Sequence, residues 1–453
     1  MSLPGSVHIG YGAFFRAHIA LYTQEAIDAH AGDDRAGDVN AGDWGIVAVA
    51  PRSTEAVDAA RRQGCRHTII ERDAEGARAL TVSVVADALS LEREREAVLA
   101  RLCDSATRLV TLTVTEKGYA ADGIVVGLLV DAIARRRADG REPFSVLSCD
   151  NLPENGRLLE RRVCDAAARR HQDELAQWIE REIAFPCCMV DRIVPAPTVA
   201  TVEAARALTG HSDPLAVETE PFRQWVIEDR FVNGRPAWDV GGATFVDDVV
   251  PWEHAKLGML NGAHTLIALA GQLLGLDTVD AVVAHPDLRR RVLRHMHAVA
   301  HVLPPGGPNH DQYAHELLAR FDNTALAHRC EQIATDSSEK VPVRWLSFAA
   351  DAVIASDAEA SRTFAWAFAL FVRWCSGVRD DGSRYALNDP RSEALQAAAQ
   401  GDAQARLEAV IAALGNVSLP FVDRPEARRE IVALLQLMLD EGVDATLNSR
   451  GAV

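Results

Sequence analysis

Short β-branched runs alternate with helix-forming stretches through the first half of this chain. Four runs have the composition of buried strands: Val7–Ile9, Gly45–Val49, Leu109–Val114 and Phe144–Leu147. Two stretches rich in Ala, Leu, Glu and Arg, Glu92–Leu102 and Gly123–Arg136, lie between them and favour helix. Strands that alternate with helices predict an α/β fold with a parallel sheet and right-handed crossovers. The Gly- and Asp-rich segment Asp33–Asp43 predicts a surface loop before the second strand.

The second half of the chain has a different pattern. Long amphipathic stretches dominate from about Pro251 onward: His254–Leu274, Pro286–Val302, Asp311–Arg320, Ser361–Ser376 and Glu426–Glu441. Because β-branched runs are rare there, we predict a mostly α-helical second domain. The change near Val249–Pro251 sets the predicted boundary, with residues 1–250 in the first domain and residues 251–453 in the second.

The composition narrows the kinds of partner that this chain could have. It has 453 residues and a formal net charge of −17, whereas nucleic acids and anionic membranes attract a positive face. The first residues do not resemble a signal peptide, and the apolar stretches Leu260–Leu274 and Phe364–Cys375 are too short to span a bilayer. The eight cysteines include no Cys-x-x-Cys pair, which argues for reduced thiols and against a zinc site. We therefore predict a soluble, cytoplasmic protein without a metal ion, and, because no apolar stripe stands out, a monomer or weak dimer.

The turn after the first predicted strand carries two glycines, Gly10 and Gly12, and leads into a helical pattern at Ala17–Ala29. Glycines in such a turn let the backbone approach a pyrophosphate at the positive end of the following helix. The third glycine of the common fingerprint is missing, so a plain strand–helix turn is the alternative. The position of the turn at the start of a βαβ series favours a dinucleotide site, with Phe14 and Arg16 as further cofactor-binding residues.

The end of the second predicted strand carries no obvious acidic residue for the ribose hydroxyls of NAD. Arg52 stands there instead, in the segment Ala50–Glu55. Its guanidinium could face the 2′-phosphate of NADP, or it could be an ordinary solvated surface group. These residues leave the choice between NAD and NADP open.

Four polar residues within twelve positions of the second half are the strongest candidates for catalytic residues. With Lys256 at zero and about 100° per residue, Glu253 falls near 60°, His264 near 80° and Asn261 near 140° on a helical wheel. Polar groups on a half-buried face are costly unless they form hydrogen bonds within the protein or bind a ligand. A desolvated lysine can act as a base, an asparagine amide can donate to an oxyanion, and a histidine can orient a hydroxyl.

The same stretch contains two glycines and one geometric difficulty. Gly258 and Gly262 fall on the opposite side of the wheel and predict close helix packing. Lys256 and His264 are separated by about 12 Å of axial rise in a regular α-helix. One small substrate therefore reaches both side chains only if the lysine bends along the helix or the helix is irregular.

Two other segments combine polar and apolar residues. Ser148–Gly156 follows the strand Phe144–Leu147, where open parallel sheets bind ligands. The alternative for Asp150 or Asn151, with Glu154 nearby, is a helix cap. The segment Phe185–Pro195 holds Asp191 and Arg192 inside an apolar run, which is typical of a structural ion pair.

Taken together, these segments resemble the polyol-specific long-chain dehydrogenases and reductases, the family that includes mannitol 2-dehydrogenase and fructuronate reductase. The matching segments occur in the family's order: His8–His18, Thr113–Tyr119, Asp150–Pro153, Met189–Arg192, Glu220–Phe222, Gln224–Val226 and the helix with Lys256, Asn261 and His264. The resemblance implies an N-terminal Rossmann-type domain, a helical C-terminal domain and an active site between them. The sequence departs from the family at Phe15, where relatives often have histidine.

The resemblance also implies roles for individual residues. Lys256 would be the general acid/base, and Asn151 and Asn261 would polarise the reacting C–O group. His264 would bind substrate hydroxyls, and Glu253 would guide proton exchange between Lys256 and solvent. Three further residues are assigned by the resemblance: Asp191 and Arg373 to the substrate, and Glu116 to the cofactor. No zinc is used in this family.

The function implied is NAD(P)-dependent hydride transfer between a sugar-derived secondary alcohol and its ketone, with NAD as the first choice of cofactor. Lys117 resembles the fructuronate reductase branch and would suit a carboxylate, which favours D-mannonate and D-fructuronate. D-mannitol and D-fructose, or another polyol such as D-arabinitol, are the alternatives. A non-catalytic nucleotide-binding protein is a further alternative, which the presence of Lys256, Asn261 and His264 disfavours.

Overall fold

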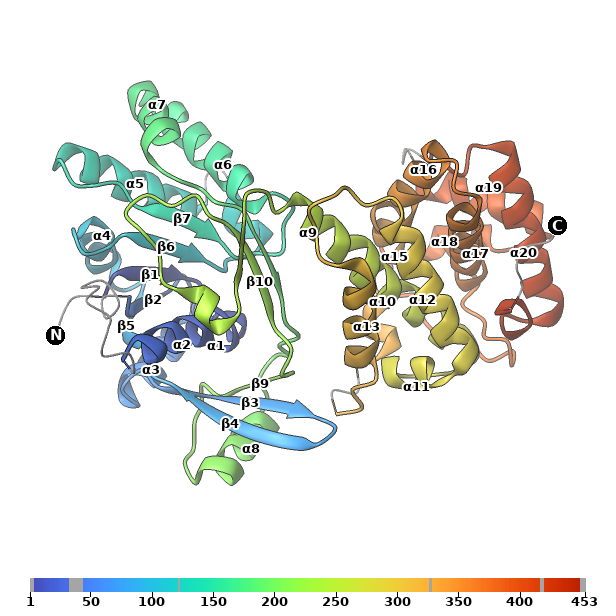
Figure 1. Cartoon of the computed structure of the whole chain (residues 1–453), viewed down its shortest axis with the longest axis horizontal. Helices are drawn as coiled ribbons and strands as arrows, with labels where there is room; N and C mark the ends of the chain where they lie inside the picture. The colour runs from blue at the N-terminus through green and yellow to red at the C-terminus, as the bar shows by residue number, and fades with distance from the viewer. Residues whose placement is uncertain (1–3, 32–43, 121–122, 326–327, 416–418, 449–453) are drawn as a thin grey trace. The chain divides into compact units, whose positions relative to one another are not determined.

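The computed structural model describes residues 4–31, 44–120, 123–325, 328–415 and 419–448, and the predicted loop Asp33–Asp43 lies outside them (Figure 1). The chain forms two compact units, Met1–Val250 and Pro251–Val453, which are described separately below. The division falls where the long amphipathic patterns begin in the sequence.

A five-stranded parallel sheet forms the centre of the first unit, in the order β5-β2-β1-β6-β7. Its strands are β1 (Ser6–Ile9), β2 (Ile46–Ala50), β5 (Val85–Ser90), β6 (Leu109–Leu112) and β7 (Ser145–Ser148). The predicted α/β class is therefore confirmed. Alternate strand residues point to opposite faces: Val7 and Ile9 contribute to one apolar core, and Ile46 and Ala48 contribute to the other.

Helices cover both faces of this sheet (Figure 1). The helices of the first unit before residue 183 are α1 (Ala13–Ala17), α2 (Ile19–Ala31), α3 (Thr54–Arg62), α4 (Arg95–Cys103), α5 (Ile124–Ala138), α6 (Asn155–Arg169) and α7 (Asp173–Glu182). Helix α8 (Val199–Thr209) packs instead against one of the two smaller sheets described below, and the short 3-10 turns are η1 (Glu116–Tyr119) and η2 (Trp238–Gly241). The prediction that the first helix begins at Ala17 is wrong. The helical backbone begins at Ala13 and breaks at His18, whose ring stacks on Phe14 and donates to the Gln224 carbonyl at 3.1 Å.

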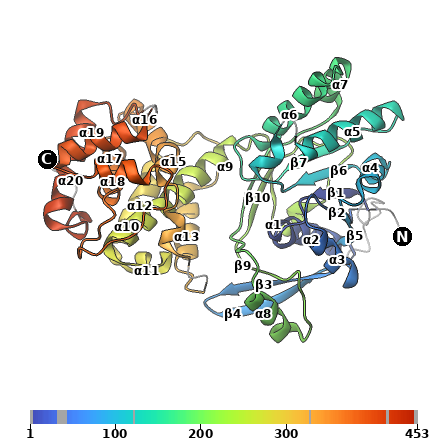
Figure 2. The same cartoon turned by 180° about the vertical axis from the view of Figure 1, so that it is seen from behind.

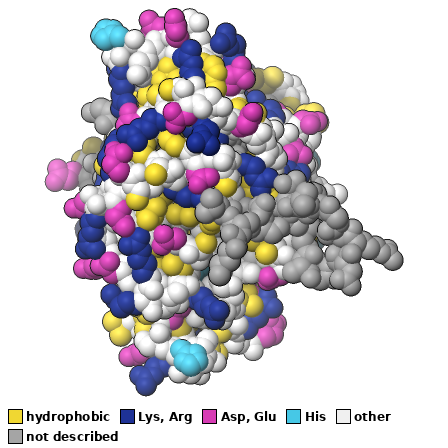
Figure 3. All heavy atoms as spheres, turned by 90° about the vertical axis from the view of Figure 1, so that its left-hand side faces the viewer, with side chains coloured by type: hydrophobic (Ala, Val, Ile, Leu, Met, Phe, Trp, Pro, Cys, Tyr) yellow, Lys and Arg dark blue, Asp and Glu magenta, His cyan; other side chains and the backbone are white. Residues whose placement is uncertain are grey.

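Two smaller sheets complete the first unit (Figure 2). One contains β4 (Gly76–Val82), β3 (His67–Asp73) and β9 (Val217–Thr219), and the other contains β11 (Thr244–Val246), β10 (Gln224–Glu228) and β8 (Cys188–Asp191). On the face seen in Figure 3, basic and acidic side chains are interspersed. Among the ion pairs at the surface of the first unit are Arg95 with Asp131 and Arg135 with Glu96.

The second unit is helical and packs around one large apolar core. Its elements are α9 (Val250–Ala255), η3 (Lys256–Asn261), α10 (Gly262–Leu274), α11 (Val279–Ala284), α12 (Pro286–Ala300), α13 (His310–Phe321), α14 (Cys330–Ile333), α15 (Ser337–Val341), η4 (Pro342–Leu346), α16 (Ser347–Ile354), α17 (Ala358–Trp374), α18 (Ser392–Ala398), α19 (Ala403–Leu414), α20 (Pro425–Glu441) and η5 (Asp444–Thr446). The mostly helical prediction is confirmed. Within the described residues, only Val250–Leu274 is long and apolar enough to cross a membrane, and 78% of its apolar window is buried, as in a core helix.

Gly258 and Gly262 let neighbouring helices approach the η3 segment closely. A Cβ on Gly258 would lie 2.5 Å from Val299 Cγ1 of α12 and 2.8 Å from Phe348 Cζ of α16. A Cβ on Gly262 would lie 2.6 Å from His295 Nε2. The predicted role of these glycines in close packing agrees with these contacts.

Replacing Gly258 with alanine should destabilise the second unit by about 1–3 kcal/mol, because the added methyl group overpacks the contact with Val299 and Phe348. The measurement is the free energy of unfolding in urea. Gly45→Ala is the matched control, since its Cβ would meet no atom closer than 3.5 Å. Equal stabilities of the two variants would contradict this account.

Three histidines lie in the cores and are held neutral by burial. Burial lowers the pKa of His8 to about 3 and the pKa values of His67 and His295 to about 4. In the unfolded chain each histidine titrates near its ordinary pKa of about 6.5. The unfolded state therefore takes up protons, and the folded state does not, as the pH falls from about 6.5 to 4.

Folding stability should be constant above pH 7 and should fall below pH 6.5, by up to about 1.4 kcal/mol per pH unit for each of these histidines. Urea unfolding at pH 8, 6 and 5 measures this slope. His295→Asn should make the slope shallower, whereas His315→Asn, at an exposed position of α13, should leave it unchanged. A stability that rises on acidification would rule out the neutral histidines.

Candidate functional site

The turn after β1 is tight at Gly10 and open at Gly12. Gly10 has a φ of +118°, and a Cβ there would lie 2.1 Å from the Thr113 carbonyl oxygen, so only glycine fits. Gly12 caps α1, and the nearest atom to a Cβ there is 3.8 Å away. The carboxyl end of β1 therefore offers open space beside a helix start, which fits the pyrophosphate of a dinucleotide.

His8 lies beneath this turn and was not among the predicted site residues. Its Nε2 is 3.1 Å from the Gly10 carbonyl and 2.9 Å from Thr113 Oγ1, and its Nδ1 is 2.8 Å from Thr111 Oγ1. The Thr113 hydroxyl also donates to the Gly10 carbonyl at 2.9 Å. The His8 ring stacks on Phe15 at 3.8 Å, so Phe15 is a core residue of the turn. The sequence feature that could have identified His8 is its position as a histidine inside a run predicted to be a buried strand.

Phe14 and Arg16, the other predicted cofactor-binding residues of this turn, differ in exposure. Phe14 is half-buried, whereas Arg16 is only 6% exposed. Arg16 donates to the Tyr11 carbonyl at 3.3 Å, and its guanidinium lies 5.6 Å from the Tyr11 ring centre. Burial lowers the pKa of Arg16. Arg16 therefore braces the turn from within, and a direct contact with the cofactor stays a prediction.

Arg52 is exposed at the carboxyl end of β2, one residue before the α3 cap Ser53. It makes no hydrogen bond or ion pair to any residue that the structure describes. Glu116 begins η1, directly after β6, but its side chain lies outside the described residues, as does that of Lys117. The cofactor-binding roles of Arg52 and Glu116 stay predictions.

Asp150 fixes the backbone between β6 and η1. Its carboxylate accepts from the Val114 and Thr115 N–H groups at 3.0 and 2.8 Å and from the Tyr119 hydroxyl at 2.6 Å. Thr115 has a φ of 64° and a ψ of 169°, a strained conformation for a residue with a Cβ. Burial and the Asp150 charge raise the pKa of Tyr119. Asp150 thus holds a strained segment at the carboxyl end of β6, the edge at which open parallel sheets bind ligands.

The alternative interpretation of the Asp150 segment as a helix cap is wrong. Helix α6 begins only at Asn155, and its cap residue Glu154 makes no capping hydrogen bond. The Asn155 amide instead donates to the Asp150 and Cys188 carbonyls at 3.0 and 2.7 Å. Asn151, predicted to polarise the substrate, is exposed just beyond β7.

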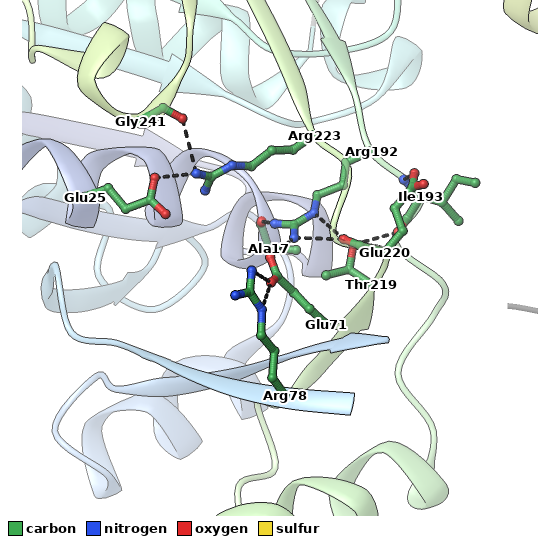
Figure 4. A network of polar contacts seen from close by, with 10 residues as sticks. All are labelled: Ala17, Glu25, Glu71, Arg78, Arg192, Ile193, Thr219, Glu220, Arg223 and Gly241. Carbon is green, nitrogen blue, oxygen red and sulfur yellow. Dashed lines mark hydrogen bonds and ion pairs between the residues drawn. The ribbon is translucent and has the colours of Figure 1, made fainter. Parts of the chain in front are cut away.

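Asp191 ends β8 and is 7% exposed, and a buried network anchors the residue after it (Figure 4). Arg192 pairs with Glu71 of β3 at 2.5 Å and donates to the Glu220 carbonyl at 2.9 and 3.2 Å and to the Ala17 carbonyl. The segment was predicted to hold a structural ion pair within itself, but Arg192 pairs with Glu71 and not with its neighbour Asp191. Arg192 connects β8 to the small sheet and to the end of α1.

Lys256 and Asn261 begin and end a π-helical turn, η3. The Gly262 N–H bonds the Leu257 carbonyl, five residues earlier, instead of the carbonyl four residues earlier. The period of 100° per residue assumed for this stretch is therefore wrong between Lys256 and Asn261. The helix is irregular here, which is one of the two conditions under which one substrate could reach both Lys256 and His264. Lys256 is 8% exposed, and Glu253 on α9 and Asn261 are half-buried.

His264 lies in the first turn of α10, after η3. Its ring packs 4.6 Å from Phe321 and 5.6 Å from His328. Burial, followed by the positive fields of His328, Arg320 and Arg344, lowers the pKa of His264 well below its ordinary value. His264 is therefore a neutral imidazole, which can donate one hydrogen bond and accept another.

Two arginines of the second unit change the list of candidate site residues. Arg373, predicted at the substrate, donates to Ser376 Oγ at 2.9 Å and to the Val378 carbonyl at 2.8 Å and pairs with Asp380 at 3.0 Å. These bonds hold the turn after α17, so we leave Arg373 out of the proposed substrate site. Arg344 of η4, which the sequence analysis missed, donates to the Asn261 carbonyl at 3.2 Å and to Thr265 Oγ1 at 2.9 Å. No sequence pattern links Arg344 to Asn261.

Replacing Gly10 with alanine should lower stability by at least about 1–3 kcal/mol, through backbone strain and the clash with Thr113. Replacing Gly12 with alanine should leave stability unchanged, because its φ of −95° suits any residue. The Gly12 variant should instead weaken dinucleotide binding, since its methyl group enters the open space. Thermal unfolding and calorimetric titration with NAD measure the two effects. Unchanged NAD affinity in Gly12→Ala would contradict the assignment of this turn.

Comparisons with known proteins cover both units. The family profile "Mannitol dehydrogenase Rossmann domain" matches residues 4–240, and "Mannitol dehydrogenase C-terminal domain" matches residues 248–436. The D-mannonate oxidoreductase of Escherichia coli (strain K12) is 36% identical over 466 residues, which cover 96% of this chain and 93% of that protein.

Two solved structures are similar over nearly the whole chain. A substrate-free D-sorbitol dehydrogenase has a TM-score of 0.87 at 28% identity and covers 98% of this chain and 95% of its own. The Pseudomonas fluorescens mannitol 2-dehydrogenase in a ternary complex with NAD and D-mannitol has a TM-score of 0.76 at 32% identity, with coverages of 98% and 94%. The chain therefore belongs to the mannitol dehydrogenase family of oxidoreductases.

Proposed function

We propose that this protein is an NAD(P)-dependent dehydrogenase that interconverts a sugar-derived secondary alcohol and its ketone, with D-mannonate and D-fructuronate as the substrate pair. The observation that carries the proposal is the π-helical turn that begins at buried Lys256 and ends at Asn261, followed by neutral His264. A proton-transfer group, an amide donor and a hydroxyl ligand on one irregular helix form the set that carbinol oxidation needs.

The first unit would hold the cofactor at the Gly10–Gly12 turn, where the open space at Gly12 suits the pyrophosphate. NAD, when bound, supplies the hydride acceptor. We propose NAD because a relative of similar structure binds it, while exposed Arg52 keeps NADP as an alternative. We further propose a cytoplasmic enzyme that needs no metal ion and works as a monomer or weak dimer.

Lys256 is the proposed general base. In the oxidation direction its neutral amine takes the proton of the substrate hydroxyl, and in the reduction direction its ammonium returns that proton. Glu253, on the helical turn before Lys256, would pass the proton between the amine and solvent. Its half-buried position is compatible with contact to both.

Three other side chains complete the proposed site. The amides of Asn151 and Asn261 would donate to the substrate oxygen as it gains alkoxide character, and Asp191 would bind a substrate hydroxyl. Arg344 and Thr265 hold the backbone of the Asn261 turn, which fixes the direction of its side chain. Placing these groups before the reaction lowers the cost of reorganisation during it.

The acidic substrate pair is favoured over neutral polyols by the identity of 36% to a D-mannonate oxidoreductase over almost the whole length. The similarity to a mannitol 2-dehydrogenase keeps D-mannitol and D-fructose as the second candidate pair. Initial rates with D-mannonate, D-mannitol and D-arabinitol, each with NAD and NADP, separate these cases. A protein that binds NAD and oxidises none of them would instead be the non-catalytic nucleotide-binding protein.

Replacing Lys256 with alanine should reduce kcat by on the order of 100- to 10,000-fold, the usual contribution of a positioned acid/base group. Affinity for NAD should stay unchanged, because the variant leaves the Gly10–Gly12 turn intact. Absorbance at 340 nm measures turnover, and calorimetry measures binding.

His254→Gln, two residues before Lys256 and exposed, is the control and should keep wild-type turnover. Near-normal activity of the Lys256 variant would overturn the proposed mechanism, whatever the substrate.

A further inference from the structure

We propose that Arg344 binds the carboxylate of the substrate and so selects an acidic sugar over a neutral polyol. This inference rests on the proposed function and names the residue that recognises its substrate class. It concerns the second unit alone.

Arg344 is held at the π-helical turn by one nitrogen of its guanidinium. Its Nη1 donates to both the Asn261 carbonyl, at 3.2 Å, and Thr265 Oγ1, at 2.9 Å. The next residue, Trp345, donates from its indole to the Gly262 carbonyl at 3.0 Å. Arg344 and Trp345 of η4 therefore bind the carbonyls of Asn261 and Gly262, which follow one another at the end of η3. These bonds fix the position of the Arg344 guanidinium.

The other two nitrogens of Arg344, Nε and Nη2, make no hydrogen bond to any residue that the structure describes. Among those residues, no carboxylate lies within 4 Å of the guanidinium either. The Arg344 side chain is half-buried, so that it has lost part of its contact with water, and this burial lowers its pKa to about 10. A partly desolvated cation without a counter-ion is costly unless an anion binds it.

Two buried arginines of the same unit have more of their guanidinium nitrogens engaged, although Arg373 Nε has no hydrogen-bond partner in the described part of the chain. Arg373 pairs with Asp380, and Arg291 donates from Nε and Nη2 to the Leu447 and Thr446 carbonyls at 2.7 Å each. Arg344 differs because the pair of nitrogens along one edge of its guanidinium is free. That edge matches the two oxygens of a carboxylate in a planar, bidentate arrangement.

The position of the free edge connects it with the proposed chemistry. Arg344 is bonded to the carbonyl of Asn261, one of the two proposed amide donors, and its positive field reaches His264, the proposed hydroxyl ligand. A ligand that contacts Asn261 and His264 is therefore near a guanidinium. Among sugar-derived alcohols, an aldonate carries a carboxylate that can meet it, whereas a hexitol has only hydroxyls.

Two variants test this assignment. Arg344→Gln keeps a shorter, neutral hydrogen-bond donor and removes the charge, and Arg344→Lys keeps the charge but removes the planar edge. We expect Arg344→Gln to lower kcat/KM for D-mannonate by on the order of 10- to 100-fold, the effect of losing hydrogen bonds between charged partners. Arg344→Lys should recover part of that loss. The rate with D-mannitol should fall by a clearly smaller factor in both variants, because D-mannitol loses only the support that Arg344 gives to the Asn261 turn.

Arg289→Gln is the matched control, because Arg289 of α12 pairs with Asp322 at the surface of the same unit. It should leave both substrates unaffected. An equal loss for D-mannonate and D-mannitol in the Arg344 variants would mean that Arg344 only supports the Asn261 turn, and the proposal would fall. A wild-type preference for D-mannitol, or for a phosphorylated polyol such as D-mannitol 1-phosphate, would also overturn it.

Calorimetric binding of D-mannonate separates this proposal from the proposed reaction. Loss of binding in Arg344→Gln but not in Arg289→Gln supports the carboxylate site even if no substrate is turned over. Undiminished binding in Arg344→Gln overturns the carboxylate site even if Lys256 is confirmed as the base. Should Arg344→Gln fail to fold, as judged by thermal unfolding, Arg344→Lys provides the same comparison.

Discussion

The hydrogen bond from the Gly262 N–H to the Leu257 carbonyl sets the geometry of the helix that carries Lys256, Asn261 and His264. It closes a turn that is one residue wider than an α-helical turn, so that Lys256 and Asn261 begin and end the same wide turn. Such turns are rare, and the surrounding structure stabilises this one. His295 of α12 lies 3.2 Å from the Gly258 carbonyl, and Trp345 binds the Gly262 carbonyl. The missing side chain of Gly262 makes the approach of His295 possible, because a Cβ there would lie 2.6 Å from His295 Nε2.

In the first unit, too, side chains of the core stabilise irregular backbone, here at the carboxyl ends of two strands. Gly10 has a positive φ after β1, and Thr115 has one after β6. Buried side chains hold both positions: His8 and Thr113 bind the Gly10 carbonyl, and Asp150 binds the Thr115 N–H. Irregular backbone thus occurs where ligands bind in parallel sheets, and neutral or fully bonded core groups keep it in place.

The sequence predicted those parts of the fold in which one local pattern dominates. Strands β1, β6 and β7 are buried on both faces and read as continuous apolar runs. The hairpin of β3 and β4 escaped prediction because β4 is half-exposed and mixes charged with apolar residues. In the site, Lys256, Asn261 and His264 were predicted from their proximity in sequence, whereas the π turn broke the assumed 100° period. Arg344 lies 83 residues from Asn261, so only the packing of η4 against η3 reveals it.

Charge explains why recognition of an acidic substrate would have to be local. The chain carries a net charge of −17, so its overall field repels an aldonate and a dinucleotide alike. At physiological ionic strength that field is screened beyond about 8 Å, and a half-buried guanidinium is screened much less. A single half-buried cation, placed beside the groups proposed to bind the substrate oxygens, can therefore outweigh many distant carboxylates. Surface pairs such as Arg289 with Asp322 contribute little to such selection, because water and salt reach them freely.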